Sequence, residues 1–397
     1  MKNIKKFLII TFMLLVSLMF AGCSNENDKN TFTINVYDID STLLGSKEIE
    51  LTDGLTAFNA LKANFNVKYS ESDYGPYLQS INGSIQDPNY YLAIYENGQM
   101  ASTGIDGLVL DNSDVFDFKV TCWQMFDETD LLVDQVIYLF FKNSLDELLK
   151  NNQVDYNLIA AIKKMSDNYY DESIFNLNFE NSYYLDEAKK DYTNETSIGT
   201  LFKASVYSKS YNQANDTIKN ALNNINDLST VASLYTIGFY LIACTNIGLD
   251  NEIYKQAKNE LINIINSSEA NDSLTMLLTI YANYNGNLEN DETLKSCLQK
   301  YQNLFKADGI EDSWSGVNAG STAQMILALT ANNINPRTYN QYDLIKILLG
   351  YELQNGTFKW QKDANEADLA FTTPQAISAL LMYKLYRDTN KPAQLFN

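Results

Sequence analysis

The pattern of apolar and polar positions divides the chain into a strand-rich part and a helical part. After residue 30, apolar residues alternate with polar ones in short runs such as Phe32-Thr33-Ile34-Asn35-Val36, which is typical of β-strands. From Asp130 the strand pattern stops and helical segments follow. The sequence therefore predicts an α+β multidomain protein, with a β-domain at residues 31–126 and an all-α domain at residues 130–397.

One helix is expected among the strands of the β-domain. Residues 55–64 carry apolar side chains at helical spacing, and Asn97-Gly98 is a strong hairpin signal. Two strands, a helix and further strands predict a β-grasp-like sheet with the helix on one face. In the strand that begins at Tyr90, alternation places Tyr91 and Tyr95 on one face and Tyr90 on the other.

The helical domain contains one pattern twice. Residues 321–329 (STAQMILAL) return as residues 372–380 (TTPQAISAL), so that Thr322 matches Thr373 at an offset of 51 residues. A unit of this length, with two helices and an aromatic turn, is an α-hairpin that needs stacked neighbours to bury its apolar face. Twelve helical segments in six pairs predict an α/α toroid of about six helical hairpins. Thr322 and Thr373 are expected at the same end of its ring of inner helices.

The first 30 residues have the pattern of an export signal. Lysines in residues 2–6 precede the apolar run 7–20, which is too short to span a membrane, and Ala21-Gly22-Cys23 resembles a bacterial lipobox. We interpret residues 1–22 as a lipoprotein signal peptide, Cys23 as the lipidated residue and residues 23–30 as a linker. The protein is then expected on the extracellular face of the bacterial cell membrane, anchored to the lipid bilayer. The alternative is an ordinary secretory leader.

Composition excludes several classes of function. The chain has 49 acidic and 29 basic residues, a net charge of −20, which repels phosphate backbones and excludes nucleic acid as a partner. It has no histidine, which excludes Ser-His-Asp and Cys-His catalysis, histidine-ligated zinc and an axial histidine on a haem or corrin metal. We expect no catalytic residues, no metal site and no covalent cofactor.

Motifs of both domains resemble a known family. In the β-domain these motifs follow one another in order: GLTAFNAL (54–61), GPYLQSING (75–83), YYLAIYENG (90–98) and LDNSD (110–114). Together they resemble the bacterial relatives of the transcobalamin and intrinsic-factor C-terminal β-domain, of the DUF4430 type. The helical domain resembles terpenoid-cyclase-like toroids, and residues 318–324 (NAGSTAQ) resemble a motif of bacterial surface proteins that pair the two domains.

The resemblance implies a surface lipoprotein that captures a ligand without catalysis. The ligand class it implies is cobalamin or a related corrinoid, held between the β-domain and the toroid mouth, with a membrane vitamin transporter as a further partner. The order of domains, β then α, is the reverse of that in the animal carriers.

Candidate ligand-binding residues lie where inner helices would begin, because free N–H groups and positive dipole ends gather there. Aromatic residues of the preceding turns could form a wall for a flat ligand, and the sheet could add tyrosines. The set is Tyr91, Tyr95, Trp314, Ser321, Thr322, Gln324, Trp360, Asp368, Thr372, Thr373 and Gln375. The structural alternative is that the hydroxyls cap helices, the glutamines pack between helices and the tryptophans seal one repeat against the next.

Two other functions are compatible with the sequence. Toroids also host carbohydrate-active enzymes, and Glu311, Asp312, Glu366 and Asp368 are the carboxylates nearest the expected mouth. In the other alternative the protein is a surface adhesin whose toroid is a scaffold. After Cys23, the thiols are Cys122, Cys244 and Cys297, an odd number that argues against a full disulfide framework.

Overall fold

The computed structural model describes residues 30–169, 174–175, 183–284 and 291–396. The chain divides into two compact units, one up to Trp123 and the other from Gln124 onward. The first is rich in strands and the second in helices, so the expected α+β multidomain layout is confirmed. The lipidation site expected at Cys23 lies outside the described residues.

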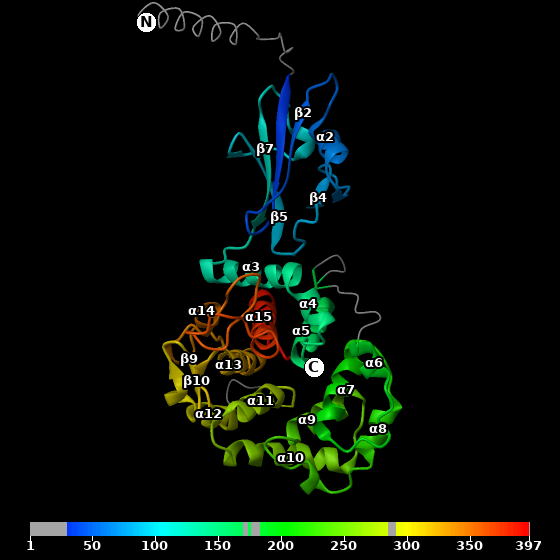
Figure 1. The fold of residues 1–397 in the computed structure, drawn as a ribbon, viewed down its shortest axis with the longest axis vertical. Coiled ribbons are helices and arrows are strands. Elements are labelled where there is room, and N and C mark those ends of the chain that lie inside the picture. Colours follow the sequence, from blue (N-terminus) through cyan, green and yellow to red (C-terminus); the bar gives the residue numbers. More distant parts are fainter. Residues whose placement is uncertain (1–29, 170–173, 176–182, 285–290, 397) are drawn as a thin grey trace, which may run out of the picture. The chain divides into compact units, whose positions relative to one another are not determined.

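The first unit is built on a five-stranded sheet (Figure 1). The central strands β1 and β7 are parallel, and the remaining pairs, β1 with β2, β7 with β5 and β5 with β6, are antiparallel. A parallel central pair between two antiparallel flanks is the expected β-grasp-like arrangement. The strands in sheet order are β2 (Leu43–Glu50), β1 (Thr31–Tyr37), β7 (Val115–Cys122), β5 (Tyr90–Glu96) and β6 (Gln99–Met100), and β3 (Val67–Ser70) pairs with β4 (Tyr77–Ile81).

Alternation along the strands decides which face of the sheet is covered. Phe32, Ile34 and Val36 of β1 are buried and share one apolar core with helix α2 (Ala57–Asn64). This helix begins later than expected, because Thr56 is the residue whose side chain accepts the N–H of Asn59 and caps it. A short helix, η1 (Ile105–Gly107), contributes to the same core.

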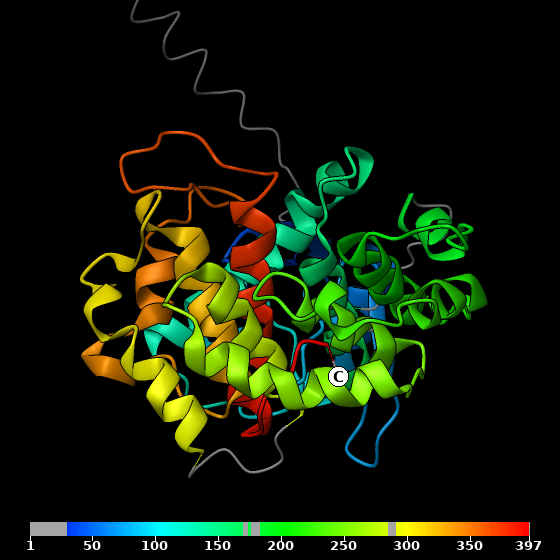
Figure 2. The same cartoon turned by 90° about the horizontal axis from the view of Figure 1, so that it is seen from below.

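Six inner helices of the second unit form a closed ring. Each contacts the next in chain order, and the last, α15, returns to contact the first, α5, so the unit is an α/α toroid (Figures 1 and 2). The inner helices are α5 (Tyr156–Asn168), α7 (Ile198–Ser210), α9 (Ile237–Asn246), α11 (Asp272–Tyr281), α13 (Ala319–Ala331) and α15 (Thr372–Thr389). Helix α9 begins only at Ile237, because residues 228–230 form a separate short helix before it.

The outer helices precede the inner ones in the chain. They are α3 (Glu128–Asn143) with α4 (Leu145–Lys150), α6 (Tyr183–Lys189), α8 (Asp216–Asn223), α10 (Glu252–Ser267), α12 (Glu292–Gln299) and α14 (Leu344–Leu349). Over the described residues this gives the predicted six pairs. Short helices η2 (Leu228–Thr230), η3 (Gln302–Leu304) and η4 (Tyr339–Gln341) and a small sheet of β8 (Phe305–Lys306), β9 (Gly309–Asp312) and β10 (Gly316–Asn318) complete the unit.

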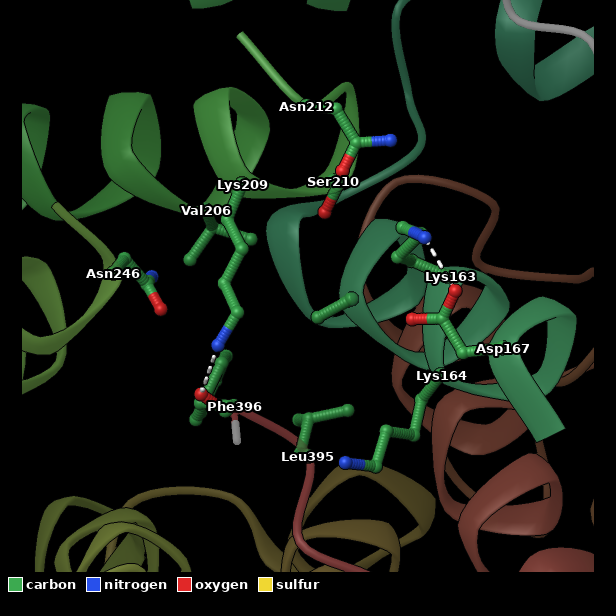
Figure 3. A pocket seen from close by; sticks show the side chains of 11 residues that line it. Lys163, Lys164, Asp167, Val206, Lys209, Ser210, Asn212, Asn246, Leu395 and Phe396 are labelled. Carbon is green, nitrogen blue, oxygen red and sulfur yellow. Dashed lines mark hydrogen bonds and ion pairs between the residues drawn. The ribbon is translucent and has the colours of Figure 1, made fainter. Parts of the chain in front are cut away.

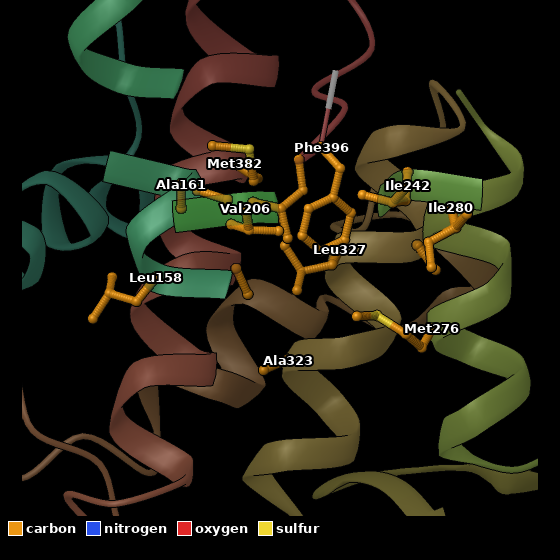
Figure 4. Close-up of a cluster of buried hydrophobic side chains, with 14 of the residues drawn as sticks. Leu158, Ala161, Val206, Ile242, Met276, Ile280, Ala323, Leu327, Met382 and Phe396 are labelled. Carbon is orange, nitrogen blue, oxygen red and sulfur yellow. The ribbon is translucent and has the colours of Figure 1, made fainter. Parts of the chain in front are cut away.

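The interior of the ring is filled with apolar side chains. Figure 4 shows residues from all six inner helices turned toward one another, with Phe396 of the C-terminal segment among them. This segment is fixed by backbone and side-chain bonds: Ala393 N–H donates to Thr330 O at 3.1 Å, and Gln394 Nε2 to Ala282 O at 2.6 Å. Leu395 and Phe396 are buried. The ring therefore encloses a packed core.

The repeated sequence pattern has a structural cause. Thr322 Oγ1 accepts the N–H of Ile310 at 3.0 Å, and Thr373 Oγ1 accepts the N–H of Phe358 at 2.9 Å, so each threonine ties the preceding turn to its inner helix. An added Cβ at Gly320, in the first turn of α13, would lie 2.8 Å from Gln375 Oε1, in the first turn of α15. The two helix starts are therefore adjacent, and the prediction that Thr322 and Thr373 lie at one end of the ring is confirmed.

In the described residues no helix is both long and apolar enough to cross a lipid bilayer.

Cys244 and Cys297 are buried thiols, and burial raises their pKa values to about 12 and about 11.

Candidate functional site

A pocket of about 260 Å³ opens where four inner helices begin. Its lining includes Tyr156 at the start of α5, Phe239 in the first turn of α9, Asp272 at the start of α11 and Gln324 on α13. The inner-helix N-termini therefore meet at one mouth of the toroid. We refer to this hollow as the mouth pocket.

The walls of the mouth pocket are aromatic and apolar. The rings of Phe239 and Phe202 stack with centroids 4.5 Å apart, and Tyr156 meets Phe202 edge-on at 5.0 Å. Tyr235 is 69% exposed at the rim, and Met276 lines the interior. Such walls suit a flat, partly apolar ligand.

Two polar groups interrupt these walls. Gln324 Oε1 is buried and has no hydrogen-bond partner in the described structure, which is a costly condition for an amide oxygen. Asp272 accepts the hydroxyl of Ser321 at 2.9 Å. Burial raises the pKa of Asp272, with a smaller contribution from Asp312, and the bond from Ser321 offsets part of the rise. The pocket thus presents an unsatisfied acceptor and a carboxyl group to a ligand.

A second carboxyl group, Asp155, lies directly before Tyr156. Its Oδ1 caps α5 by accepting the N–H of Leu158 at 2.8 Å. Burial raises the pKa of Asp155 from 3.8 to about 6. Hydrogen bonds from Leu158 and Asn157 and the charge of Lys203 oppose this rise. This carboxyl group therefore costs stability when ionised.

We predict that Asp155→Asn stabilises the helical unit at neutral pH. As pH rises from about 4 to about 6, the unfolded chain releases this proton before the folded chain does, so Asp155 lowers stability progressively over that range. Asparagine also caps helices well, and the variant should gain about 1–2 kcal/mol at pH 7, a gain that fades toward pH 4. Urea unfolding followed by circular dichroism at the two pH values measures it. A difference that does not change with pH would contradict the assignment.

Six of the polar residues predicted from sequence form three pairs in the structure. Gln324 lines the mouth pocket, and Ser321, which does not line it, donates its hydroxyl to Asp272, which does. Thr322 and Thr373 are fully buried in the turn contacts described above. Asp368 and Thr372 serve the start of α15, where Asp368 Oδ2 accepts the N–H and the hydroxyl of Thr372.

The residues that cap α13 and α15 are not the hydroxyl residues expected from the sequence. Asn318, and not Ser321, caps α13, because its side chain accepts the N–H of Ser321 at 2.8 Å. Thr372 lies inside α15, and Asp368 caps that helix from the preceding loop.

The two tryptophans predicted to form an aromatic wall lie in different environments. Trp360 is half-buried, and its ring and the Gln375 amide both lie against Gly320, where an added Cβ would be 2.7 Å from the ring. Trp314, in the turn between β9 and β10, is 95% exposed. Neither tryptophan is among the residues that line the mouth pocket, which takes its aromatic walls from α5 and α9.

Tyr91 and Tyr95 lie on the sheet face opposite α2, as alternation predicts, whereas Tyr90 is buried. The ring of Tyr95 lies 4.9 Å from Lys119 Nζ, which also contacts Asp117 at 3.1 Å. This half-exposed aromatic and charged face of the first unit is a second candidate surface.

The carboxylates considered for hydrolysis are mostly engaged in local contacts. Glu311 pairs with Lys306 at 3.0 Å on the small sheet, and Asp312 accepts N–H groups of its own turn. Glu366 is exposed and Asp368 caps α15. The mouth pocket is lined by one carboxylate, Asp272, so its lining lacks the carboxylate pair that glycoside hydrolysis requires.

Sequence reasoning missed Tyr156, Tyr235, Phe239, Asp272 and Met276. These residues lie on helices outside the repeated pattern or, for Tyr235, in the turn before α9, and only the ring brings them beside Gln324. One sequence signal was available. Asp155 caps α5 and Asn271 caps α11, and such capping residues mark the N-terminal ends of helices, the same ends that the repeat marks. Among the described residues, no cluster of three or more Cys, Asp or Glu is placed to hold a metal ion.

Comparisons with known proteins found one family model and a solved structure with similarity to part of the chain. A solved structure from Ruminococcus gnavus ATCC 29149, described as a "putative metal binding protein", is similar at 18% identity with a TM-score of 0.23, over 24% of this chain and 100% of that chain. The comparison with curated proteins found no match. Residues 54–121 match the family model described as "Domain of unknown function (DUF4430)". The strand-rich unit therefore contains a DUF4430 domain.

Proposed function

We propose that this protein is an extracellular, lipid-anchored ligand-binding protein that captures a corrinoid at the toroid mouth. The observation that carries the proposal is the mouth pocket, in which the unsatisfied oxygen of Gln324 lies among aromatic walls. The ligand class and the anchor come from the family resemblance of the sequence. A membrane vitamin transporter that receives the ligand belongs to the same proposal.

A corrinoid fits the chemistry of the mouth pocket. Its ring has apolar faces and an edge of amide side chains, and amide N–H groups would satisfy Gln324 Oε1 and bond to Asp272. A volume of about 260 Å³ holds the edge of such a ring rather than the whole molecule. The sheet face opposite α2, which carries Tyr91 and Tyr95, is proposed as a further surface that contacts the ligand. Binding measurements on variants at these two positions test this.

The charges at the mouth favour some corrinoids over others. Asp272 lines the pocket and Asp155 lies beside Tyr156, so a phosphate group placed there meets negative charge. We expect cobinamide, which lacks the nucleotide phosphate, to bind at least as tightly as cobalamin. The chain has no histidine to replace a cobalt ligand, so the absorbance spectrum should change little on binding.

Calorimetry with cobalamin and cobinamide tests the proposal. We predict that Gln324→Ala weakens binding by about 1–3 kcal/mol, because the ligand loses a buried hydrogen bond. Gln299→Ala, an exposed glutamine on α12, is the matched control and should bind like the unaltered protein. No heat and no co-elution with either corrinoid would overturn the proposal and favour the adhesin.

The anchor is tested separately in cells. Cys23→Ser should abolish incorporation of labelled fatty acid and release the protein or leave its leader uncleaved, since lipidation takes place on that thiol. Cys122→Ser is the control and should label normally. Undiminished labelling of the Cys23→Ser variant would contradict the lipoprotein assignment.

A further inference from the structure

Two adjoining hollows lie at the ends of inner helices opposite the mouth pocket. The smaller, of about 140 Å³, is lined where α5 and α7 end, and the larger, of about 330 Å³, where α7 and α9 end and α8 begins. Lys209, Asn212 and Asn246 line both hollows, so the two form one site. Figure 3 shows the smaller hollow, with Asn246, Lys209 and Phe396 on one side and Asp167 on the other. We refer to the two hollows together as the far pocket.

The amide group of Asn246 has a fixed orientation in the far pocket. Its Nδ2 donates to Ser205 Oγ at 3.2 Å, and the Ser205 hydroxyl donates in turn to Phe202 O at 2.7 Å. A flipped amide would place Oδ1 against a hydroxyl whose hydrogen is already used, so the nitrogen has to face Ser205. The Oδ1 atom is then left buried without a hydrogen-bond partner in the described structure. Such an oxygen calls for a donor supplied by a ligand or by water.

The charged groups of the far pocket create no preference for a charged ligand. In the smaller hollow Lys163 is paired with Asp167, and Lys164 is engaged as well. Lys209 Nζ donates to Phe396 O at 3.4 Å. The start of α8 adds one exposed carboxylate and one exposed lysine to the larger hollow, and these balance one another. A ligand that fits these groups is therefore neutral overall.

The larger hollow is lined mostly by polar side chains. Eight of its ten lining residues carry hydroxyl, amide, ammonium or carboxylate groups, whereas the mouth pocket is lined mainly by aromatic and aliphatic residues. Neutral hydrogen-bonding groups among them include Asn212 and Gln213, in the turn after α7. In the smaller hollow, Val206 and Leu395 add an apolar side. This combination matches a saccharide, which has hydroxyl groups around its edge and C–H groups on the faces of its ring.

We propose that the far pocket binds a neutral saccharide of one or two rings. A hydroxyl group of the sugar donates to Asn246 Oδ1, and other hydroxyl groups bond to the amides of the turn after α7. The larger hollow, of about 330 Å³, lies within the range of small-molecule sites, about 300–1,000 Å³. The site is separate from the mouth pocket, and the proposal does not depend on corrinoid binding.

Calorimetry and saturation-transfer NMR on the full chain test the proposal. The probes are glucose, galactose, N-acetylglucosamine and maltose, and permethylated glucose is the control ligand because it has no hydroxyl group to donate. At least one of the sugars should bind and permethylated glucose should not. Affinity should change by less than about twofold between about 50 and about 500 mM salt, since no charge is neutralised on binding.

Two results of these measurements would overturn the proposal. Failure of all four sugars to bind would leave water as the partner of Asn246 Oδ1. An affinity that falls steeply with added salt would show that the site selects charge, and a neutral saccharide would then be the wrong class.

Variants locate the bound sugar. Asn246→Ala should weaken binding at least tenfold, because it removes the buried acceptor. Asn212→Gly removes a second amide, keeps the left-handed backbone of that position (φ +52°), and should also weaken binding. Asn283→Ala is the matched control, because the Oδ1 atom of Asn283 is likewise buried without a partner in the described structure but Asn283 lines neither hollow. Its affinity for the sugar should be unchanged.

The pattern across these variants decides whether the far pocket is the site. Unchanged affinity in both Asn246→Ala and Asn212→Gly, or equal weakening in the Asn283→Ala control, would contradict the assignment. The Gln324→Ala variant should bind sugars like the unaltered protein, since Gln324 lines the mouth pocket. Loss of sugar binding in that variant would assign the sugar to the mouth pocket instead.

Discussion

Lys384→Met should destabilise the helical unit by about 3–5 kcal/mol, since it leaves two buried carboxylates beside only one buried cation, Arg387. Lys384 is 1% exposed, and its Nζ lies 3.1 Å from both Asp134 Oδ1 and Asp388 Oδ2. Arg387 is bidentate to Asp134 at 2.9 and 3.0 Å and also bonds to Asp388 at 2.8 Å. The two cations and two carboxylates form one buried network, between α3 and α15.

The network is electrically balanced, and this decides how variants combine. Burial raises the pKa of Asp388, but Lys384 and Arg387 outweigh it and hold that pKa below its usual value. Asp134→Asn alone leaves an excess of buried positive charge and should cost a similar amount. The two changes together restore the balance, so the double variant should be clearly more stable than the sum of the single losses predicts.

Chemical unfolding followed by circular dichroism measures this cycle. Lys295→Met is the control, because Lys295 and Glu292 form an exposed pair at 3.4 Å that should be worth less than about 1 kcal/mol. If Lys384→Met costs no more than this control, the network does not stabilise the fold. Strictly additive losses would show that the four charges act separately.

Gly356→Ala adds only one methyl group, yet it should lower the free energy of unfolding by more than about 3 kcal/mol. Gly356 has φ +71°, and an added Cβ would lie 2.6 Å from Phe140 N, Phe140 Cβ and Val136 O of α3. Two of these atoms are backbone, so α3 must move. The same helix carries Asp134, and its displacement would also disturb the ion network.

Gly248→Ala is the control that separates the cost of the steric clash at Gly356 from the cost of a left-handed backbone conformation. Gly248 follows α9 with φ +64°, and an added Cβ there meets nothing within 4 Å. Its loss should be about 1–2 kcal/mol, the cost of the left-handed conformation alone. The two variants are compared by the denaturant midpoint of the same unit. Equal losses at both glycines would contradict the close packing on α3.

Local patterns predicted the architecture because the elements themselves are local. The alternation of Phe32, Ile34 and Val36 predicted a covered sheet face, and the repeat at Thr322 and Thr373 predicted equivalent inner helices. Irregular features were missed. Residues 391–396 have no helix or strand pattern, yet they place Phe396 in the core of the ring.

The candidate site was predicted less completely than the fold. The repeat led to Ser321 and Gln324, because helix starts at one end of a ring meet at one mouth. It also led to Asp368 and Thr372, whose polar atoms are engaged in the start of α15. The aromatic wall was assigned to Trp314 and Trp360, although Tyr156 and Phe239 supply it, because partners from distant helices are known only after the ring closes.

Closure of the ring also determines when the helical unit can fold. The bond between Lys384 and Asp134 joins residues 250 positions apart, and that between Arg387 and Asp134 spans 253. Contacts so distant in sequence require a large loop-closure entropy and slow the search for the native state. An open stack of hairpins can form pair by pair, whereas this ring has to wait for α15. We therefore expect the chain to remain exposed to proteases until α15 packs against α5, and a polypeptide that ends before α15 to stay exposed.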